Sequence, residues 1–412
     1  MGKFLQKPLK EQEVLSRSKR LWMAIILGSL AAFGPLSIDM YLPALPNIAK
    51  DFDTNASLVQ LSLSLFVIGL ASGQLLTGPI SDVIGRRKPL LVGLIIYFIV
   101  SLVCVFCPSI WGLIILRFIQ GFAGSAGVVI SRAIVRDLYS GSELTKFFSL
   151  LALVNGLAPI LAPILGAQLL NVVPWQGIFI VLSIIGIVMF FAILFGLPET
   201  LQKEKRSAGG MKNTFYPFLK LIVDRRFMGY ALAQGFVFAC MFAYISGSPF
   251  VIQDIYGASP QMFSLIFAIN AIGIMINSQI AGRLAGRIPE SKLFTFGLGM
   301  SFIGGIVMLL FIILQAKLFF ILIPLFFVVS SVGIVNTAGF SLAMQTQGKN
   351  AGSASAMLGV TSLAFGGLVA PLVGIGGGQT AIPMGVVIVC GGIGAVLCFL
   401  ILVKRKGKEM AD

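Results

Sequence analysis

Twelve long apolar runs dominate this chain of 412 residues. A helix needs about 20 consecutive apolar residues to cross the ~30 Å hydrocarbon core of a bilayer. Because lipid offers no hydrogen bonds to the backbone, spanning segments are either helices or closed barrels. We therefore predict an all-α polytopic membrane protein with twelve transmembrane helices. The runs are approximately 21–45, 57–80, 89–107, 109–137, 145–170, 175–197, 227–253, 261–284, 292–314, 317–344, 352–377 and 381–403.

The distribution of charge predicts the orientation in the membrane. Only 11% of the residues are charged, against about 25% in soluble domains. With both termini in the cytoplasm, the inner tails and loops would hold all Lys and Arg residues except Lys50, Lys317 and Arg117. The positive-inside rule predicts this asymmetry. The net charge of +15 is therefore read as an orientation signal, and we expect no nucleic-acid partner.

The longest polar stretch divides the chain into two halves. We predict an N-terminal tail (1–20), a six-helix bundle (21–197), a cytoplasmic linker (198–226), a second six-helix bundle (227–403) and a C-terminal tail (404–412). A weak repeat supports the division, since the segment at Gly78 resembles the segment at Gly282, 204 residues later. Internal duplication with pseudo-two-fold symmetry is typical of secondary transporters.

Two charged residues lie well inside apolar runs, Asp39 and Arg117. A charge at the centre of a membrane helix costs about 2.5–3.5 kcal/mol on insertion scales, so such residues usually have a function. The helical rise puts Asp39 ~9 Å and Arg117 ~12 Å below the same outer face. The two could form a static ion pair, or the acid could titrate beside a fixed cation. We favour titration, with Asp39 binding a proton and Gln120 either relaying it or only joining helices.

Two other segments suggest moving parts. Pro159 and Pro163, four residues apart, must bend their helix and predict a hinge. After the second span, the loop carries an Asp at a helix C-terminus, where the helix dipole opposes it and an outside partner is needed. We expect that loop to latch the two halves together near residues 351–353, the alternative being a solvated topogenic loop. The expected latch residues are Gly78, Asp82, Gly85, Arg86 and Arg87.

Several uncharged polar residues inside the spans are candidates for lining a substrate cavity, although each alone is more often a helix–helix contact. These candidates are Tyr41, Gln120, Asn155, Gln234, Tyr244, Asn270 and Asn336. The chain has no histidine, which argues against His-ligated metals and Ser-His-Asp hydrolases. We expect no cofactor, no metal and no enzymatic activity, and we interpret Cys104 and Cys107 as two small buried apolar residues.

At these residues the chain resembles the major facilitator superfamily. The loop from Gly78 to Arg87 matches its 2–3 loop motif, and Arg117 with Gln120 and Gly121 matches its fourth-helix motif. Within the superfamily the chain is similar to the bicyclomycin/chloramphenicol-resistance (Bcr/CflA) branch of drug:proton antiporters. The segments carrying that similarity are 37–46, 131–137, 158–163, 197–200 and 352–356.

The resemblance implies a proton site at Asp39, a coupling partner at Arg117 and an inner latch at Asp82 and Arg86. It also implies an exporter-type fifth helix, although Ala158 departs from the commoner Gly-Pro form. Some related exporters carry a second helix-one acid about two turns earlier, which Leu30-Ala31-Ala32-Phe33 lacks, so strong transport of dicationic drugs is not expected.

We therefore expect a monomeric exporter of small amphipathic drugs or toxic metabolites, exchanging them for protons by alternating access in the bacterial cytoplasmic membrane. Its partners would be the drug, protons and the lipid bilayer. The alternatives are proton-coupled uptake of a metabolite, which the prolines of the fifth span disfavour, and an intramembrane enzyme or receptor. The lack of a catalytic carboxylate pair argues against the enzyme, and the lack of a sizeable soluble domain argues against the receptor.

Overall fold

The computed structural model describes residues 17–206, 219–345, 347, 351–376 and 378–404, and it is helical throughout these ranges apart from short connections and one isolated bridge. In the first half, five continuous helices follow the first span. They are α4 (Ala56–Ile84), α5 (Arg87–Val105), α6 (Ile110–Leu138), α7 (Gly141–Leu169) and α8 (Gln176–Gly196).

The first span is broken rather than straight. It consists of α1 (Arg17–Ala31), α2 (Phe33–Asp39), a 3₁₀ turn η1 (Leu42–Ala44) and α3 (Leu45–Asp51). Its two apolar parts are bent by 46°. Three prolines remove backbone donors from this segment, namely Pro35, Pro43 and Pro46, so a regular helix cannot run through it. Among the described residues, eleven other helices are long and apolar enough to cross a membrane, or twelve with this broken span.

The second half repeats the helical pattern. It contains α10 (Arg225–Pro249), α11 (Pro260–Leu284), α12 (Glu290–Ile313), α13 (Leu318–Met344), α14 (Ala351–Val373) and α15 (Ile382–Cys398). A π-helical turn, η3 (Phe250–Ile255), follows Pro249 at the end of α10. A 3₁₀ turn, η5 (Gly374–Gly376), extends α14, and a π turn, η6 (Phe399–Lys404), extends α15.

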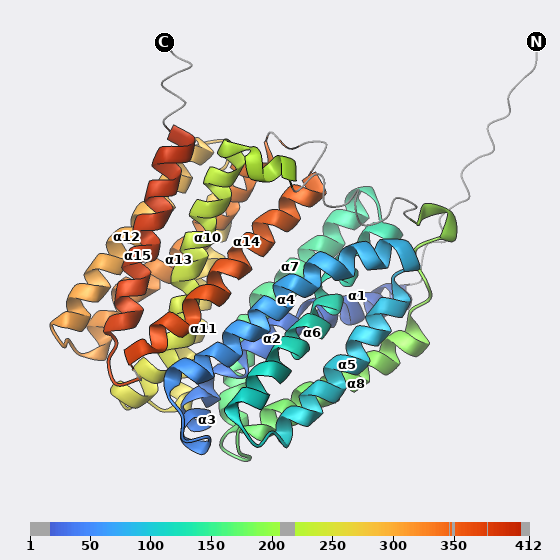
Figure 1. Cartoon of the computed structure of the whole chain (residues 1–412). Helices are drawn as coiled ribbons and strands as arrows, with labels where there is room; N and C mark the ends of the chain where they lie inside the picture. Colours follow the sequence, from blue (N-terminus) through green and yellow to red (C-terminus); the bar gives the residue numbers. More distant parts are fainter. Residues whose placement is uncertain (1–16, 207–218, 346, 348–350, 377, 405–412) are drawn as a thin grey trace, which may run out of the picture.

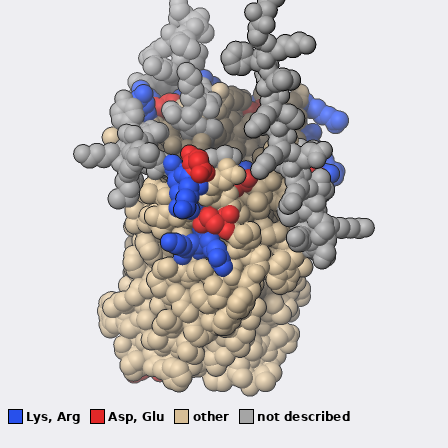
Figure 2. Space-filling model, turned by 90° about the vertical axis from the view of Figure 1, so that its right-hand side faces the viewer, with Lys and Arg blue, Asp and Glu red and all other residues tan. Residues whose placement is uncertain are grey.

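Figure 1 shows two groups of helices, α1 to α8 on one side and α10 to α15 on the other. We call the end that carries the α4–α5, α6–α7 and α11–α12 connections the basic end, and the opposite end, at α3, the far end. On the face shown in Figure 2, charged residues gather towards the basic end, and the surface below is nearly free of them. Such a charge-free band is what a lipid-facing surface requires.

Glycines let two pairs of helices approach closely. A Cβ at Gly121 of α6 would overlap the Phe66 carbonyl oxygen of α4. In the second half, a Cβ at Gly333 of α13 would overlap the Ile274 carbonyl oxygen of α11. Small residues at such crossings allow backbone-to-backbone packing in membranes, where no hydrophobic force drives helices together. The α4–α6 and α11–α13 crossings are therefore built in the same way.

Candidate functional site

Asp39 is the last residue of α2 and is only 5% exposed. Its carboxylate makes no hydrogen bond or ion pair with any residue that the structure describes. The residue in the second half with which it interacts electrostatically is Tyr244 of α10. The end of α2 therefore holds a buried carboxylate with no described hydrogen-bond or ion-pair partner, within electrostatic range of Tyr244. A buried carboxylate without a partner is costly in its charged form, which favours proton binding.

Arg117 lies fully buried in α6, close to the broken first span. Its Nη2 donates to the Ser37 carbonyl oxygen at 2.9 Å, and its Nη1 donates to Gln120 Oε1 at 2.6 Å. The guanidinium carbon also lies 4.3 Å from the ring centre of Phe66 and 4.5 Å from that of Tyr41. Aromatic faces attract cations, and more strongly where water is excluded.

Asp39 and Arg117 do not form an ion pair in the part of the chain that the structure describes. Arg117 instead binds the backbone of Ser37, two residues before the acid. The static ion pair considered from the sequence is therefore not seen. The titration role of Asp39 stays a prediction. Depth in the membrane did not predict that Arg117 would contact the helix of Asp39 through a backbone carbonyl oxygen.

Gln120 orients Arg117 through its amide oxygen and donates from Nε2 to Ser101 Oγ at 2.7 Å. Ser37 continues this network, because its hydroxyl lies 2.6 Å from the Tyr97 hydroxyl. Tyr41, fully buried, pairs with Ser62 at 2.9 Å. Gln120 and Tyr41, both expected to line a cavity, are fully buried around Arg117 in this structure, and their cavity role stays a prediction.

Four of the remaining five cavity candidates form two hydrogen-bonded pairs in the second half, and the fifth, Asn155, lies in the first half. Asn270 Nδ2 of α11 donates to the Tyr244 hydroxyl at 3.0 Å, and Gln234 Nε2 of α10 donates to Asn336 Oδ1 of α13. Asn155 of α7 bonds only to the carbonyl of Leu151 in its own helix. Among the described residues, the candidates thus form an Arg117 network, two pairs and Asn155 within its own helix, and Tyr244 lies within electrostatic range of Asp39.

The expected hinge residues Pro159 and Pro163 lie inside α7, which is one continuous helix. The Pro163 carbonyl oxygen accepts a hydrogen bond from Ser264 Oγ of α11 at 2.9 Å. This bond links the two halves, so the proline segment lies at the interface between them. Its role as a hinge stays a prediction.

The expected latch residues form a charged cluster within the first half. Arg86 donates to Asp82 and, from Nε, to Asp137 of α6 at 2.9 Å. Gly85 has a φ of +102°, which favours glycine, and a Cβ there would overlap Glu199. Arg87 donates to the Leu194 carbonyl of α8. Gly78 of α4 lies one turn before Asp82, and its carbonyl oxygen accepts a hydrogen bond from Ser81 Oγ at 2.8 Å.

Glu199 completes this cluster and was not singled out as a site residue from the sequence. Its carboxylate accepts from the backbone N–H groups of Arg86 at 2.8 Å and Arg87 at 3.2 Å, at the start of α5. Burial alone would raise the pKa of Glu199, but hydrogen bonds from the Arg86, Leu201 and Arg87 backbones and the nearby Arg206 charge outweigh it, so the pKa is lowered. The signal was present in the sequence, as an acid three residues after α8.

At the far end, the two halves are joined by direct hydrogen bonds. Gln60 Nε2 of α4 donates to the Ser246 carbonyl of α10 at 3.0 Å, and Ser57 Oγ donates to the Pro371 carbonyl of α14 at 2.8 Å. An ion pair at 3.2 Å joins Lys50 to Asp254. At the basic end, by contrast, Asp82 makes no bond to the second half among the described residues, and the space around Gly352 of α14 is open.

Comparisons with known proteins agree with these features. The sequence matches the family Major Facilitator Superfamily over residues 25–371. It is 46% identical to the MFS-type transporter YdgK of Bacillus subtilis (strain 168) over 94% of this chain and 97% of that protein. It is 32% identical to a bicyclomycin resistance protein homolog of Haemophilus influenzae, covering 90% of this chain and 93% of the relative.

A solved structure shows the same fold at low sequence identity. It is a bacterial homolog of the human lysosomal transporter Spinster, in an inward-facing and occupied conformation. The two structures align with a TM-score of 0.74 and 14% identity, over 95% of this chain and 98% of the other. This likeness concerns the fold alone.

Proposed function

The chain belongs to the major facilitator superfamily, whose members are transporters and not enzymes, and we propose that it exports small amphipathic drugs or toxic metabolites in exchange for protons. The observation that carries the proposal is Asp39, a buried carboxylate with no described hydrogen bond or ion pair, within electrostatic range of Tyr244 in the opposite half. An acid within electrostatic range of the other half can change its affinity for a proton as the distance between the halves changes. Similarity to a bicyclomycin resistance protein homolog supports drugs as the cargo.

The coupling we propose follows from the partners of Asp39 and Arg117. When the acid is protonated, the buried Arg117 remains held by Ser37, Gln120 and two aromatic rings. When the halves move and Asp39 ionises, its carboxylate, two residues along the chain from Ser37, stabilises Arg117. Proton binding and substrate binding then exclude one another, so substrate binding is accompanied by proton release, which is the basis of antiport.

The two ends of the molecule support alternating access. The far end is closed by bonds between the halves, including Gln60 to Ser246, whereas the charged cluster at the basic end stays within the first half. We place the basic end in the cytoplasm on the positive-inside rule, with both chain termini there and the protein in the bacterial inner membrane. The conformation is then open to the inside, and Asp82 with Arg86 would close against α14 in the opposite conformation.

The available driving force is adequate for export. One proton crossing ~100 mV supplies about 2.3 kcal/mol, and one pH unit adds about 1.4 kcal/mol. At one proton per substrate molecule, the sum sustains a concentration gradient of roughly 500-fold.

The proposal is tested in proteoliposomes with an imposed pH gradient, using labelled chloramphenicol and bicyclomycin as probes. We expect drug movement against the proton flow, and loss of that movement in Asp39→Asn with partial retention in Asp39→Glu. Gradient-driven movement in the same direction as the protons would instead indicate uptake. Unchanged drug transport in the Asn variant would remove Asp39 from the mechanism.

A further inference from the structure

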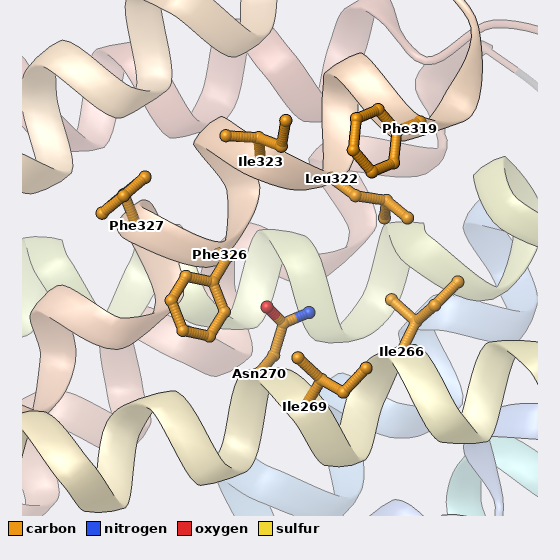
Figure 3. Close-up of a pocket in the computed structure, with 8 residues that line it drawn as sticks. All are labelled: Ile266, Ile269, Asn270, Phe319, Leu322, Ile323, Phe326 and Phe327. Atoms are coloured by element: carbon orange, nitrogen blue, oxygen red, sulfur yellow. The ribbon is translucent and has the colours of Figure 1, made fainter.

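A crevice of about 240 Å³ opens on the side of the second half, between α11 and α13 (Figure 3). α11 contributes Ile266, Ile269 and Asn270, and α13 contributes five apolar side chains, three of which are phenylalanines. Ile269 is 50% exposed and Phe319 is 67% exposed, so the crevice opens onto the outer surface of the helices. In a membrane, that surface contacts lipid.

Asn270 is the polar side chain in this apolar crevice, and it is only 3% exposed. Its Nδ2 donates to the Tyr244 hydroxyl, whereas its Oδ1 accepts no hydrogen bond from any described residue. Figure 3 shows the amide between the two helices, with Phe326 on one side and Leu322 above. Oδ1 is not among the fully buried polar atoms, so it opens into the crevice. An amide oxygen without a donor is unfavourable in such apolar surroundings, and lipid chains carry no donor that could satisfy it.

We propose that this crevice binds an aromatic amphiphile dissolved in the membrane, whose hydroxyl or N–H group donates to Asn270 Oδ1. The ring would pack against Phe326 and its neighbouring phenylalanines, which suit offset or edge-to-face contacts. The volume of about 240 Å³ exceeds the roughly 150 Å³ of a cavity that binds benzene, so a ring with a short alkyl chain fits.

A second crevice on the first half provides an internal comparison. It is larger, about 570 Å³, and lies among α1, α7 and α8, with Gly28, Val154 and Met189 in its lining. Its polar side chain is Ser29, and it contains no buried amide. A ligand with a hydrogen-bond donor should therefore prefer the α11–α13 crevice, whereas a pure hydrocarbon should not distinguish the two in this way.

The inference does not depend on the proposed proton exchange, because it concerns binding at equilibrium. The protein is placed in lipid nanodiscs and labelled with a phenol that carries a photoreactive diazirine, and the labelled peptides are identified by mass spectrometry. We expect saturable labelling of peptides from α11 and α13. Competition by 4-propylphenol should be about fivefold stronger than competition by propylbenzene, which lacks only the hydroxyl and so lacks the net contribution of one hydrogen bond.

Two variants make the result specific. Asn270→Leu removes the acceptor and should make the phenol and the hydrocarbon compete equally, while Ser29→Ala in the other crevice should change nothing. Ile269→Trp fills the crevice from its rim without touching the Asn270–Tyr244 bond, and it should abolish labelling even if the leucine variant does not fold. Equal competition by both molecules in the parent protein would overturn the proposal and leave the crevice as a groove covered by lipid. So would unchanged labelling of Ile269→Trp.

Discussion

The two halves share a backbone plan but differ in the chemistry at equivalent crossings. The offset of 204 residues that relates Gly78 to Gly282 also relates Gly69 to Gly273 and Phe66 to Asn270. At the α4–α6 crossing, Phe66 contacts the buried cation Arg117. At the α11–α13 crossing, Asn270 borders an apolar crevice and bonds to Tyr244.

The comparison separates packing from function. Both crossings depend on a glycine against a carbonyl oxygen, at Gly121 and at Gly333. Only the first half places an acid and a base well inside its described spans, at Asp39 and Arg117. The backbone pattern therefore accounts for the fold, and the departures from symmetry mark the residues to which we assign proton coupling and ligand binding.

The largest effect is expected when the cation of the first half is removed while its volume is kept. Arg117→Met should reduce gradient-driven drug transport by at least tenfold, because Asp39 then lacks the nearby positive charge in its ionised state. The melting temperature should not fall, since a buried ion without a carboxylate partner carries a large desolvation penalty. Transport assays and thermal unfolding of the purified protein measure both, with Val329→Met in α13 as the matched control. A variant that unfolds early but transports normally would contradict this account of Arg117.

A second test asks whether the two crossings are equally important for packing. Gly121→Ala and Gly333→Ala should each destabilise the protein by about 1–3 kcal/mol, because the added methyl group overlaps a carbonyl oxygen. Gly299→Ala is the control, since a Cβ at that position meets nothing within 4 Å. Thermal unfolding in one detergent compares all three. If only one crossing is sensitive, the structural symmetry does not extend to stability.

The two ends of the molecule can be compared through the bonds that close one of them. Gln60→Ala removes the bond to the Ser246 carbonyl and should favour opening at the far end, whereas Asp82→Asn should disfavour closure at the basic end. Each variant loses about 1 kcal/mol of interaction free energy, which corresponds to a roughly fivefold change in the ratio of the two conformations. Single cysteines introduced on either side, in a background without the native cysteines, report accessibility to a thiol reagent. Identical labelling of both variants and the parent would remove these residues from the gates.

The smallest effect is expected at Glu199, which is exposed but has a lowered pKa. Because its pKa is lower in the folded protein than in the unfolded chain, its stabilising contribution is present at neutral pH and is lost as the pH falls through the folded-state value. Glu199→Gln should thus lower stability by no more than about 1 kcal/mol at pH 7, and the difference should vanish once acid protonates the carboxyl in the folded protein. A difference that persists in acid would point to packing rather than charge.

Much of the fold follows from the sequence, because hydrophobic length and the Lys/Arg distribution are one-dimensional signals. The predicted span 109–137 corresponds to α6 (Ile110–Leu138), and 261–284 corresponds to α11 (Pro260–Leu284). The first span was expected at approximately 21–45, and hydropathy gave neither its full length nor its bend. It continues to Asp51 and is bent by 46° between α1 and α2, because Pro35 lacks the N–H group that would bond to the Ala31 carbonyl, which a hydropathy pattern does not register.

The site was predictable by residue type but not by contact. Asp39 and Arg117 stand out as charges in apolar runs, yet helical rise gives depth and not direction. The sequence therefore did not show that Arg117 would bind the Ser37 carbonyl. It also did not show that Tyr244 would lie within electrostatic range of Asp39. Glu199 was missed because capping α5 from the end of α8 is a contact between distant segments.

The central claim is that the first half carries the proton at Asp39, and proton release on ligand binding tests it directly. Purified protein in weakly buffered solution is titrated with chloramphenicol while a pH indicator counts the protons released. We predict close to one proton per bound drug molecule for the parent protein and none for Asp39→Asn, with Ser29→Ala behaving like the parent. The same proton release from Asp39→Asn would contradict the account.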